Sequence, residues 1–338
     1  MSASNLIQRF WYRDSLWRWP LYPLSVLLQL LVLIKRFLYQ KRILKVREFS
    51  VPVIVVGNIT VGGTGKTPFI AYLAGQLVKK NYRVGIVSRG YQSQLSAYPH
   101  LVTSDDSVAD IGDEAFMQYA NMSLPMAIGP DRVRAVELLL SKFSLDLVIS
   151  DDGLQHYRMG RDLEVLMVDA QRKFGNQLML PFGPLREPLS RLNSVDFIVE
   201  NVGESPQLPV CAQMLTEIKG LFQVCSNLPV ALSNLEENSV CAVAGIGNPQ
   251  RFFNTLSQCV ANFERRIFPD HHQFVQSDFN GLDDDLVIMT EKDAVKCRNF
   301  ARQNWYYLKI EAKLEDHQLS RLMDMINHAR LKKRPDNG

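Results

Sequence analysis

Residues 57–68, GNITVGGTGKTP, carry the residue types and the spacing of a phosphate-binding loop. Closely spaced glycines let successive backbone N–H groups turn toward phosphate oxygens, Lys66 adds a positive charge for the β- and γ-phosphates, and the Thr67 hydroxyl is a ligand for Mg2+. The usual pattern has a glycine where this chain has Thr60, so the loop is a variant. A purely structural turn between a strand and a helix is the alternative. The residues expected to bind nucleotide phosphates are Gly62, Gly63, Thr64, Gly65, Lys66 and Thr67.

Two adjacent acids, Asp151 and Asp152, follow the apolar segment Leu145 to Ser150. A carboxylate at such a strand end approaches Mg2+ from the side opposite the hydroxyl of Thr67. Neighbouring carboxylates repel each other unless a cation or hydrogen-bond donors offset them, which favours a metal site. The alternative is a helix cap with a solvated neighbour. The expected metal ligands are therefore Thr67, Asp151 and Asp152.

Phosphoryl transfer to a hydroxyl needs a group that accepts or orients its proton, and two segments offer one. Asp113 begins a helix, where an acid is also an ordinary cap facing the helix dipole. Asp270, His271 and His272 form the second candidate, in which only one of the two adjacent histidines can face the site. A zinc site is the rival interpretation, and a third ligand at suitable spacing is missing.

Arginines stand at several expected strand and helix ends, where they suit bidentate phosphate binding. If they converge on one crevice of a parallel sheet, they favour a substrate with a phosphate of its own, whereas surface ion pairs are the alternative. Gln155 and His156 directly follow the paired acids, and we interpret His156 as a supporting residue. The arginines are Arg89, Arg132 and Arg186, the last beside Glu187 in a proline-rich loop.

The segment Thr290 to Asp293 contains the residue types of the guanine-reading motif of GTPases. Asp293 follows Lys292 directly, so the spacing is wrong and GTP specificity is not supported.

The elements around these residues form a repeating pattern of short apolar strands and amphipathic helices, typical of a parallel sheet covered on both faces. The loop at 57–68 opens the first helix of that sheet. We expect an α/β fold of the P-loop NTPase type, with a smaller C-terminal α/β domain. The expected divisions are 1–48, 49–220 and 221–338, with the boundary region between about 205 and 238. Expected strands are Val53–Val56, Val84–Ser88, Pro125–Ile128, Leu145–Ser150, Leu163–Val168, Val195–Val199, Cys241–Ala244, Leu286–Thr290 and Trp305–Ile310. Expected helices lie near 67–80, 113–121, 131–143, 188–193, 250–260 and 316–331.

The first 48 residues are basic and contain an uncharged run from Trp19 to Ile34. This run is shorter than a comfortable membrane-spanning helix, and no signal-peptide cleavage site follows it. Aromatic residues precede its strongly apolar part, Leu24 to Ile34, as at membrane interfaces. We expect a helix anchored on one membrane leaflet, the alternative being a helix buried against the protein body. The aromatic residues are Trp11, Tyr12, Trp17, Trp19 and Tyr22.

The chain of 338 residues is long enough for two domains, and its net charge of +3 gives no reason to expect a nucleic-acid partner. Its five cysteines have no paired spacing and are expected to be reduced packing residues of a cytoplasmic protein.

With these motifs assembled, the chain resembles the tetraacyldisaccharide 4'-kinase family. The resemblance covers nearly the whole chain and is carried by motifs in the family's order. They are GNITVGGTGKTP, SRGY (88–91), GDE (112–114), DDGLQH (151–156), PFGPLRE (181–187), GIGNP (245–249), FPDHH (268–272) and TEKDAVK (290–296). A proline that usually follows the GDE acids is Ala115 here.

The resemblance implies transfer of the γ-phosphoryl group of ATP, with Mg2+, to the 4'-hydroxyl of an acylated glucosamine disaccharide 1-phosphate. The product would be lipid IVA, made at the cytoplasmic face of the inner membrane by a peripheral protein with no obligate protein partner. It implies Asp113 with His271 as the proton-accepting pair and Lys66 as a further catalytic residue. A membrane-associated P-loop ATPase acting as a switch or targeting factor is the alternative; it would need no such pair. Implied supporting residues are Arg132, Gln155, Arg186 and Glu187, to which we add Arg89 from its place at the end of the second expected strand.

Overall fold

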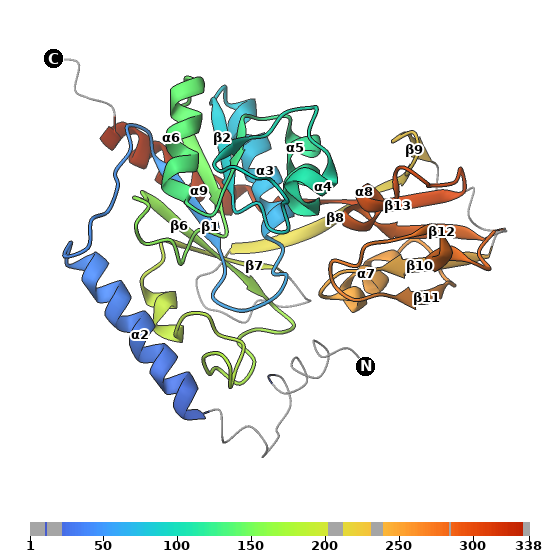
Figure 1. The fold of residues 1–338 in the computed structure, drawn as a ribbon, viewed down its shortest axis with the longest axis horizontal. Coiled ribbons are helices and arrows are strands. Elements are labelled where there is room, and N and C mark those ends of the chain that lie inside the picture. Colours follow the sequence, from blue (N-terminus) through green and yellow to red (C-terminus); the bar gives the residue numbers. More distant parts are fainter. Residues whose placement is uncertain (1–10, 12–21, 202–211, 231–238, 284, 334–338) are drawn as a thin grey trace.

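The computed structural model describes residues 11, 22–201, 212–230, 239–283 and 285–333 (Figure 1). Within these residues, thirteen strands form one sheet in the order β11-β10-β12-β13-β8-β7-β6-β1-β5-β2-β4-β3, and β9 pairs with β8. The strands are β1 Val53–Gly57, β2 Val84–Ser88, β3 His100–Leu101, β4 Met126–Ile128, β5 Leu147–Asp151, β6 Leu163–Asp169, β7 Phe197–Asn201, β8 Ala212–Gln223, β9 Pro229–Val230, β10 Val240–Ala244, β11 Glu264–Ile267, β12 Leu286–Thr290 and β13 Trp305–Leu314. The helices are α2 Tyr22–Gln40, α3 Lys66–Lys79, α4 Val108–Ile111, α5 Asp113–Met122, α6 Arg132–Lys142, α7 Pro249–Leu256, α8 Glu291–Cys297 and α9 Asp316–Lys333, with 3-10 helices at Leu189–Asn193 and Gln276–Phe279.

The larger lobe is built on parallel strands with β1 near the middle, between β5 and β6. Every residue of β1 is buried, because alternate side chains face opposite layers. Ile54 and Val56 pack in one core with α3, whereas Val53 and Val55 pack in another with α6. Helices therefore cover both faces, which confirms the predicted P-loop type of α/β fold.

The last helix, α9, returns to the larger lobe. Its Leu322, Met323 and Ile326 lie in the same core as Ile54 of β1 and Leu73 of α3. The helix thus covers one face of the nucleotide-site sheet, although it follows the whole second lobe in the chain.

The smaller lobe repeats the layered arrangement on β10, β11, β12 and β13 (Figure 1). Cys241 and Val243 pack with α8 on one face, and Ala242 and Ala244 pack with α7 on the other. The lobes are joined through β8 and β13, two long strands that pair antiparallel, so the sheet is continuous. A division of the chain at residue 220 stays a prediction, since β8 runs through that position.

Helix α2 lies along the outside of the larger lobe with one narrow stripe in contact (Figure 1). Ser25 is buried and donates its hydroxyl hydrogen to the backbone oxygen of Met179 at 2.7 Å, and Leu28 and Val32 pack against the core behind it. The helix is 19 residues long and apolar enough to cross a membrane by length and composition, and 6% of its most apolar window is buried. The alternative, a helix buried against the protein body, therefore holds only along this stripe. Of the aromatic residues before it, Tyr12, Trp17 and Trp19 lie outside the described residues.

Most expected strands and helices are present, with ends that differ by a few residues. Two differences bear on the site: the strand expected at Val195–Val199 is β7, Phe197–Asn201, so it ends on a polar residue, and residues 291–297 form α8, which was not expected. Strand β8 occupies part of the region expected to hold the domain boundary.

Candidate active site

The loop between β1 and α3 has the backbone that its glycines predict. Gly62 and Gly65 have φ of 107° and 86°, in the left-handed region that favours glycine. At Gly63 a Cβ atom would meet nothing within 4 Å, so open space lies beside the loop. Lys66 begins α3, and its Nζ lies 3.2 Å from Asn58 Oδ1 and 3.5 Å from Asp152 Oδ1. The loop therefore presents backbone, open space and a lysine ammonium together, as a phosphate site requires.

A buried asparagine at the end of β7 supports this loop from behind. Asn201 Nδ2 donates to the backbone oxygen of Thr64 at 3.0 Å, and its Oδ1 accepts from Arg251 Nη2 of α7 at 2.7 Å. Arg172 Nη2, in the loop after β6, donates to the backbone oxygen of Gly247. The phosphate loop is thereby connected to the smaller lobe through side chains that no sequence motif indicated.

The paired acids lie at the end of β5, directly beside β1. Asp151 is buried, and its Oδ2 accepts from Gln118 Nε2 of α5 at 2.6 Å. Burial raises the pKa of Asp151 to about 6, against the lowering effect of Lys66. Asp152 has a φ of 51° and pairs with Arg186 at 2.9 Å. Burial acts to raise the pKa of Asp152, but the charges of Lys66 and Arg186 outweigh it and lower that pKa.

The donor set at this strand end fits Mg2+. Asp151 Oδ1 and Asp152 Oδ1 are buried without a hydrogen-bond partner, and both are carboxylate oxygens of the kind that Mg2+ prefers. Within the described residues, no three His, Cys, Asp or Glu side chains are grouped to hold a metal ion. Magnesium sites commonly use one or two carboxylates and take their other ligands from substrate phosphates and water, so two acids beside Thr67 suffice.

Asp113 and His271, which are far apart in the chain, are in contact. Asp113, at the start of α5, and His271, in the loop after β11, approach to 3.1 Å between Oδ2 and Nδ1. His271 has a φ of 60°, and Tyr91 lies beside its ring at 5.0 Å between centroids. Burial acts to raise the pKa of Asp113, but the hydrogen bond from His271 and the charge of Lys292 outweigh it and lower the pKa. Asp113 therefore remains a carboxylate at neutral pH.

The neighbouring histidine is held elsewhere. His272 Nε2 lies 2.9 Å from Asp278 Oδ2, and its ring stacks on Phe268 at 4.7 Å between centroids. Of the two adjacent histidines, only His271 meets Asp113, which agrees with the expectation that one of them faces the site.

The helix that carries Asp113 also reaches the paired acids. Its Gln118 holds Asp151, and the negative charge of Glu114 acts on Asp151 as well. Helix α5 thus connects the Asp113–His271 pair to the acids at the end of β5. The phosphate loop follows the neighbouring strand β1, so it lies at the same edge of the sheet.

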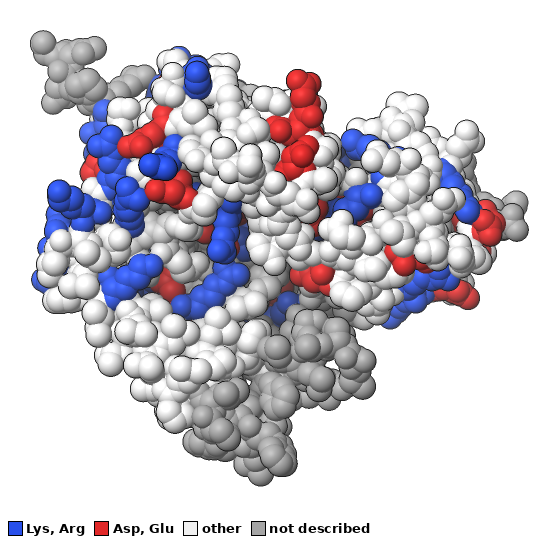
Figure 2. All heavy atoms as spheres, in the orientation of Figure 1, with Lys and Arg blue, Asp and Glu red and all other residues white. Residues whose placement is uncertain are grey.

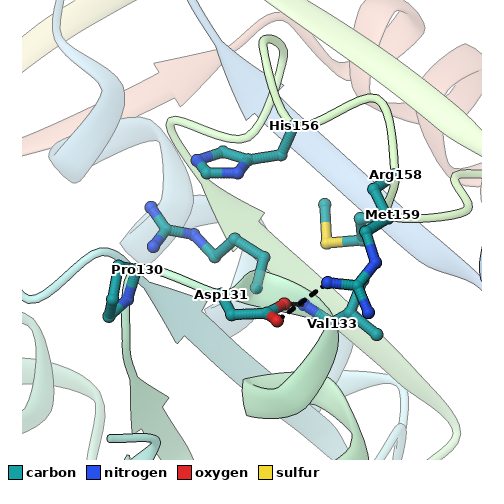
Figure 3. A pocket seen from close by; sticks show the side chains of 7 residues that line it. Pro130, Asp131, Val133, His156, Arg158 and Met159 are labelled. Carbon is teal, nitrogen blue, oxygen red and sulfur yellow. Dashed lines mark hydrogen bonds and ion pairs between the residues drawn. The ribbon is translucent and has the colours of Figure 1, made fainter.

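Arg132 and His156 line a cavity of about 360 Å³ beside the carboxyl ends of the strands (Figure 3). Arg132 is buried, donates to the backbone oxygens of Gly129 and Asp151, and has an Nε without a partner. Burial, together with the charges of Arg132 and Arg89, lowers the pKa of His156 to about 4, so the ring is neutral. The cavity is lined by Pro130, Asp131, Arg132, Val133, His156, Arg158 and Met159.

The surroundings of this cavity are basic. Arg89 is exposed, and Arg158 at the rim pairs with Asp131 at 2.9 Å. Figure 2 shows Lys and Arg side chains gathered on this face between α6 and α2. Asp131 offsets the charge of Arg158, whereas Arg132 keeps a buried Nε without a hydrogen-bond partner, which favours an anionic ligand.

Glu187 is buried inside the protein, where a substrate would not contact it. It is fully buried and accepts from Gln155 Nε2 at 2.7 Å, Tyr157 OH at 2.5 Å and Arg191 Nε at 3.0 Å. Gln155 also donates to the backbone oxygen of Asn58 at 3.2 Å. Glu187 and Gln155 therefore tie the loop after β5 to the start of the phosphate loop, while Arg186 beside them reaches Asp152.

The sheet order, the loop between β1 and α3 and the acids at the end of β5 define a P-loop nucleotide-binding protein. Residues 17–327 match the family model described as tetraacyldisaccharide-1-P 4'-kinase. The chain therefore belongs to the tetraacyldisaccharide-1-P 4'-kinase family, a family of phosphotransferases, as its motifs predicted.

Known proteins agree with this placement. The chain is 44% identical over 313 residues to a tetraacyldisaccharide 4'-kinase of Legionella pneumophila strain Corby, covering 93% of this chain and 95% of the relative. It is 45% identical over 320 residues to the enzyme of the same name from Shewanella frigidimarina, covering 93% and 94%. A crystal structure of LpxK from Aquifex aeolicus in complex with ATP superposes with a TM-score of 0.79 and 30% identity, covering 93% of this chain and 99% of that one.

Proposed function

We propose that this protein transfers the γ-phosphoryl group of ATP to the 4'-hydroxyl of a tetraacylated glucosamine disaccharide 1-phosphate, the step of lipid A biosynthesis that makes lipid IVA. Membership of the family and the ATP complex of the Aquifex aeolicus relative support ATP as the donor. The phosphate loop and Lys66 bind and orient the β- and γ-phosphates.

The observation that carries the proposal is the contact between Asp113 and His271. A P-loop ATPase acting as a switch or targeting factor needs a phosphate loop and a metal site, but it has no sugar hydroxyl to deprotonate. His271 takes the proton of the 4'-hydroxyl, and Asp113 orients the ring and stabilises the charge that it gains. The oxygen then attacks the γ-phosphorus as the bond to the leaving ADP breaks.

Asp151, Asp152 and Thr67 would hold Mg2+, since Asp151 Oδ1 and Asp152 Oδ1 are buried acceptors without a hydrogen-bond partner. When bound, Mg2+ would neutralise charge on the phosphates of ATP. Arg186 and Lys66 keep Asp152 in place before the nucleotide binds.

The basic cavity beside the strand ends would take the phosphorylated sugar. Arg132 faces it from a buried position, and the charge of Arg89 acts on His156 in its lining. A guanidinium suits a phosphate monoester because it donates two parallel hydrogen bonds. We expect neither a nucleic acid nor an obligate protein partner.

Helix α2 would hold the protein on the cytoplasmic face of the inner membrane as a peripheral protein. Its stripe through Ser25 fastens it to the body, and the leucines on its other side are about half exposed, Leu27 at 51% and Leu31 at 54%. An exposed apolar face of this kind, with Lys35 and Arg36 in the helix and Lys41 just after it, suits a helix lying in a lipid interface.

The test is transfer of label from γ-labelled ATP to the disaccharide lipid in mixed micelles, followed by thin-layer chromatography. Asp113→Asn and His271→Gln are each expected to lower turnover by roughly 10² to 10⁴-fold while ATP affinity changes little. The chain offers a matched control in His100 and Asp106, an acid–histidine pair with Nε2 and Oδ1 2.9 Å apart on the far edge of the sheet. ATP hydrolysis without labelled lipid would favour the switch ATPase instead.

A further inference from the structure

The ammonium group of Lys292 faces the ring nitrogen of His271 that Asp113 leaves free. Lys292 Nζ lies 3.3 Å from His271 Nε2, while His271 Nδ1 lies 3.1 Å from Asp113 Oδ2. The same ammonium lies 3.1 Å from Glu114 Oε1, 3.8 Å from Asp113 Oδ2 and 3.9 Å from Asp270 Oδ1. One mostly buried cation, 16% exposed, therefore contacts the histidine and the acids around it.

Lys292 is charged in these surroundings. Burial acts to lower its pKa, but the charges of Glu114, Asp113 and Asp270 outweigh this and raise the pKa above its ordinary value. An ammonium group only donates hydrogen bonds, so Nε2 of His271 can face it only with a lone pair. The ring hydrogen must then be on Nδ1, where it is donated to Asp113.

We propose that Lys292 is a positioning residue that keeps His271 neutral, with its hydrogen on Nδ1 and its Nε2 lone pair ready for the acceptor hydroxyl. The inference rests on the proposed role of Asp113 and His271 as the proton-accepting pair. A protonated ring would place an N–H group and its positive charge against the ammonium of Lys292, which disfavours that form.

The groups around the ring act in opposite directions. Asp113 from α5 and Asp270 from the same loop, whose Oδ1 lies 3.9 Å from Nε2, favour a protonated ring, whereas Lys292 from α8 opposes it. Tyr91, after β2, lies beside the ring at a tilt of 56°, and Lys296 of α8 lies 3.9 Å from Asp113 Oδ2. Of these cations, Lys292 is the one in contact with the nitrogen that must accept the proton.

The contact between Lys292 and His271 must change when the substrate binds. The hydroxyl replaces Lys292 at Nε2, its proton moves to Nε2, and its oxygen forms the bond to the γ-phosphorus as the bond to ADP breaks. Lys292 keeps Glu114 as its partner at 3.1 Å, so the ammonium stays beside the new phosphate ester.

The first experiment compares pH profiles of kcat/KM for the lipid at saturating ATP, with full-length protein in mixed micelles. Lys292→Met removes the charge and keeps a long side chain; the acidic limb of its profile is expected to move up by roughly one pH unit or more, because losing a neighbouring cation makes the ring easier to protonate. Above the limb, turnover should recover to within a few fold of wild type. Lys292→Arg should restore the limb, and Lys313→Met, which removes an exposed lysine from β13, should not move it.

The second experiment measures the tautomer directly by long-range 1H–15N NMR of the full-length protein with labelled histidine. The His271 signal is assigned by its loss in His271→Gln. A neutral ring with hydrogen on Nδ1 at pH 7 in wild type, and a protonated ring at the same pH in Lys292→Met, would support the proposal.

Other outcomes distinguish a failure of the role proposed for Lys292 from a failure of the proton-accepting pair. A wild-type ring with its hydrogen on Nε2, an unmoved acidic limb in Lys292→Met, or an equal loss of turnover at every pH would overturn the role of Lys292. Undiminished turnover in His271→Gln would instead refute the proton-accepting pair, and the NMR result would still report whether Lys292 sets the tautomer.

Discussion

Replacing Gly65 by alanine should damage the phosphate loop through one identified contact. Gly65 has a φ of 86°, and an added Cβ would lie 2.1 Å from Nδ2 of Asn201 and 3.0 Å from Cε of Met214. The methionine end can move, but the asparagine is bound at both ends, to Thr64 O at 3.0 Å and to Arg251 at 2.7 Å. In Gly65→Ala, either the backbone of the loop is strained or Asn201 moves and loses its hydrogen bonds to Thr64 and Arg251.

The cost divides into two parts. A left-handed backbone costs an alanine ~1–2 kcal/mol. Displacing Asn201 adds ~1–3 kcal/mol, because buried polar groups lose their partners. Gly65→Ala should therefore lower the free energy of unfolding by ~2–5 kcal/mol in the wild-type background, but by only ~1–2 kcal/mol in Asn201→Ala, where the obstructing amide is gone.

The assay is urea unfolding of the four proteins of this double-mutant cycle, with Gly75→Ala as control. Gly75 lies inside α3 with nothing within 4 Å of an added Cβ, so alanine there should be neutral or stabilising by ~0.5–1 kcal/mol. The two substitutions should be less than additive by ~1–3 kcal/mol. If Gly65→Ala costs the same with and without Asn201, the asparagine does not restrict the loop and the reasoning is refuted.

Leu27→Ser with Leu31→Ser on the exposed face of α2 should weaken binding to anionic vesicles by roughly tenfold or more per leucine, measured by sedimentation, because each buried leucine side chain contributes ~1.5–3 kcal/mol; unchanged binding would place the anchor elsewhere. Glu187→Ala should lower the free energy of unfolding by ~3–5 kcal/mol in urea titrations, since it leaves Arg191 buried without this partner, and a loss of activity alone would contradict it. His156 has a folded pKa of about 4, below its unfolded value of about 6.5, so the unfolded chain binds the extra proton and stability falls as pH drops from 6.5 to 4. Because the ring is only partly buried and solvent screens it, His156→Asn should remove ~1–2 kcal/mol of that decline, and equal slopes of unfolding free energy against pH in both proteins would show that the ring is not held neutral.

The motifs that depend on local sequence were predictable. The phosphate loop needs glycines at fixed positions, and the apolar strand before it must be buried on both faces. Residues 53–67 could therefore be recognised from the sequence as a strand and a phosphate loop. Asp113 and His271 were found as separate candidates, because a helix cap and an acid–histidine run are each visible in the chain. Their contact depends on how the two lobes pack against each other, which the local sequence pattern does not indicate.

Other features are invisible for the same reason. Asn201 supports the phosphate loop only because β6 lies beside β1 in the sheet and β7 lies beside β6. That strand order is a property of the whole fold. Strand β8 is half exposed along much of its length, so it lacks the apolar run that marked the others. Glu187 is a charged residue in a proline-rich loop and is nonetheless fully buried, because three donors converge on it.

The position of α9 has a consequence for how the protein is made. Leu322, Met323 and Ile326 complete the core around β1 and α3, yet they are translated after nearly everything else. At ~5–20 residues per second, the first strand and helix wait on the order of 10–50 s for the helix that covers them. During that time their apolar face is open to chaperones and to aggregation, so a ribosome stalled before α9 would hold a nucleotide-site core that cannot yet close.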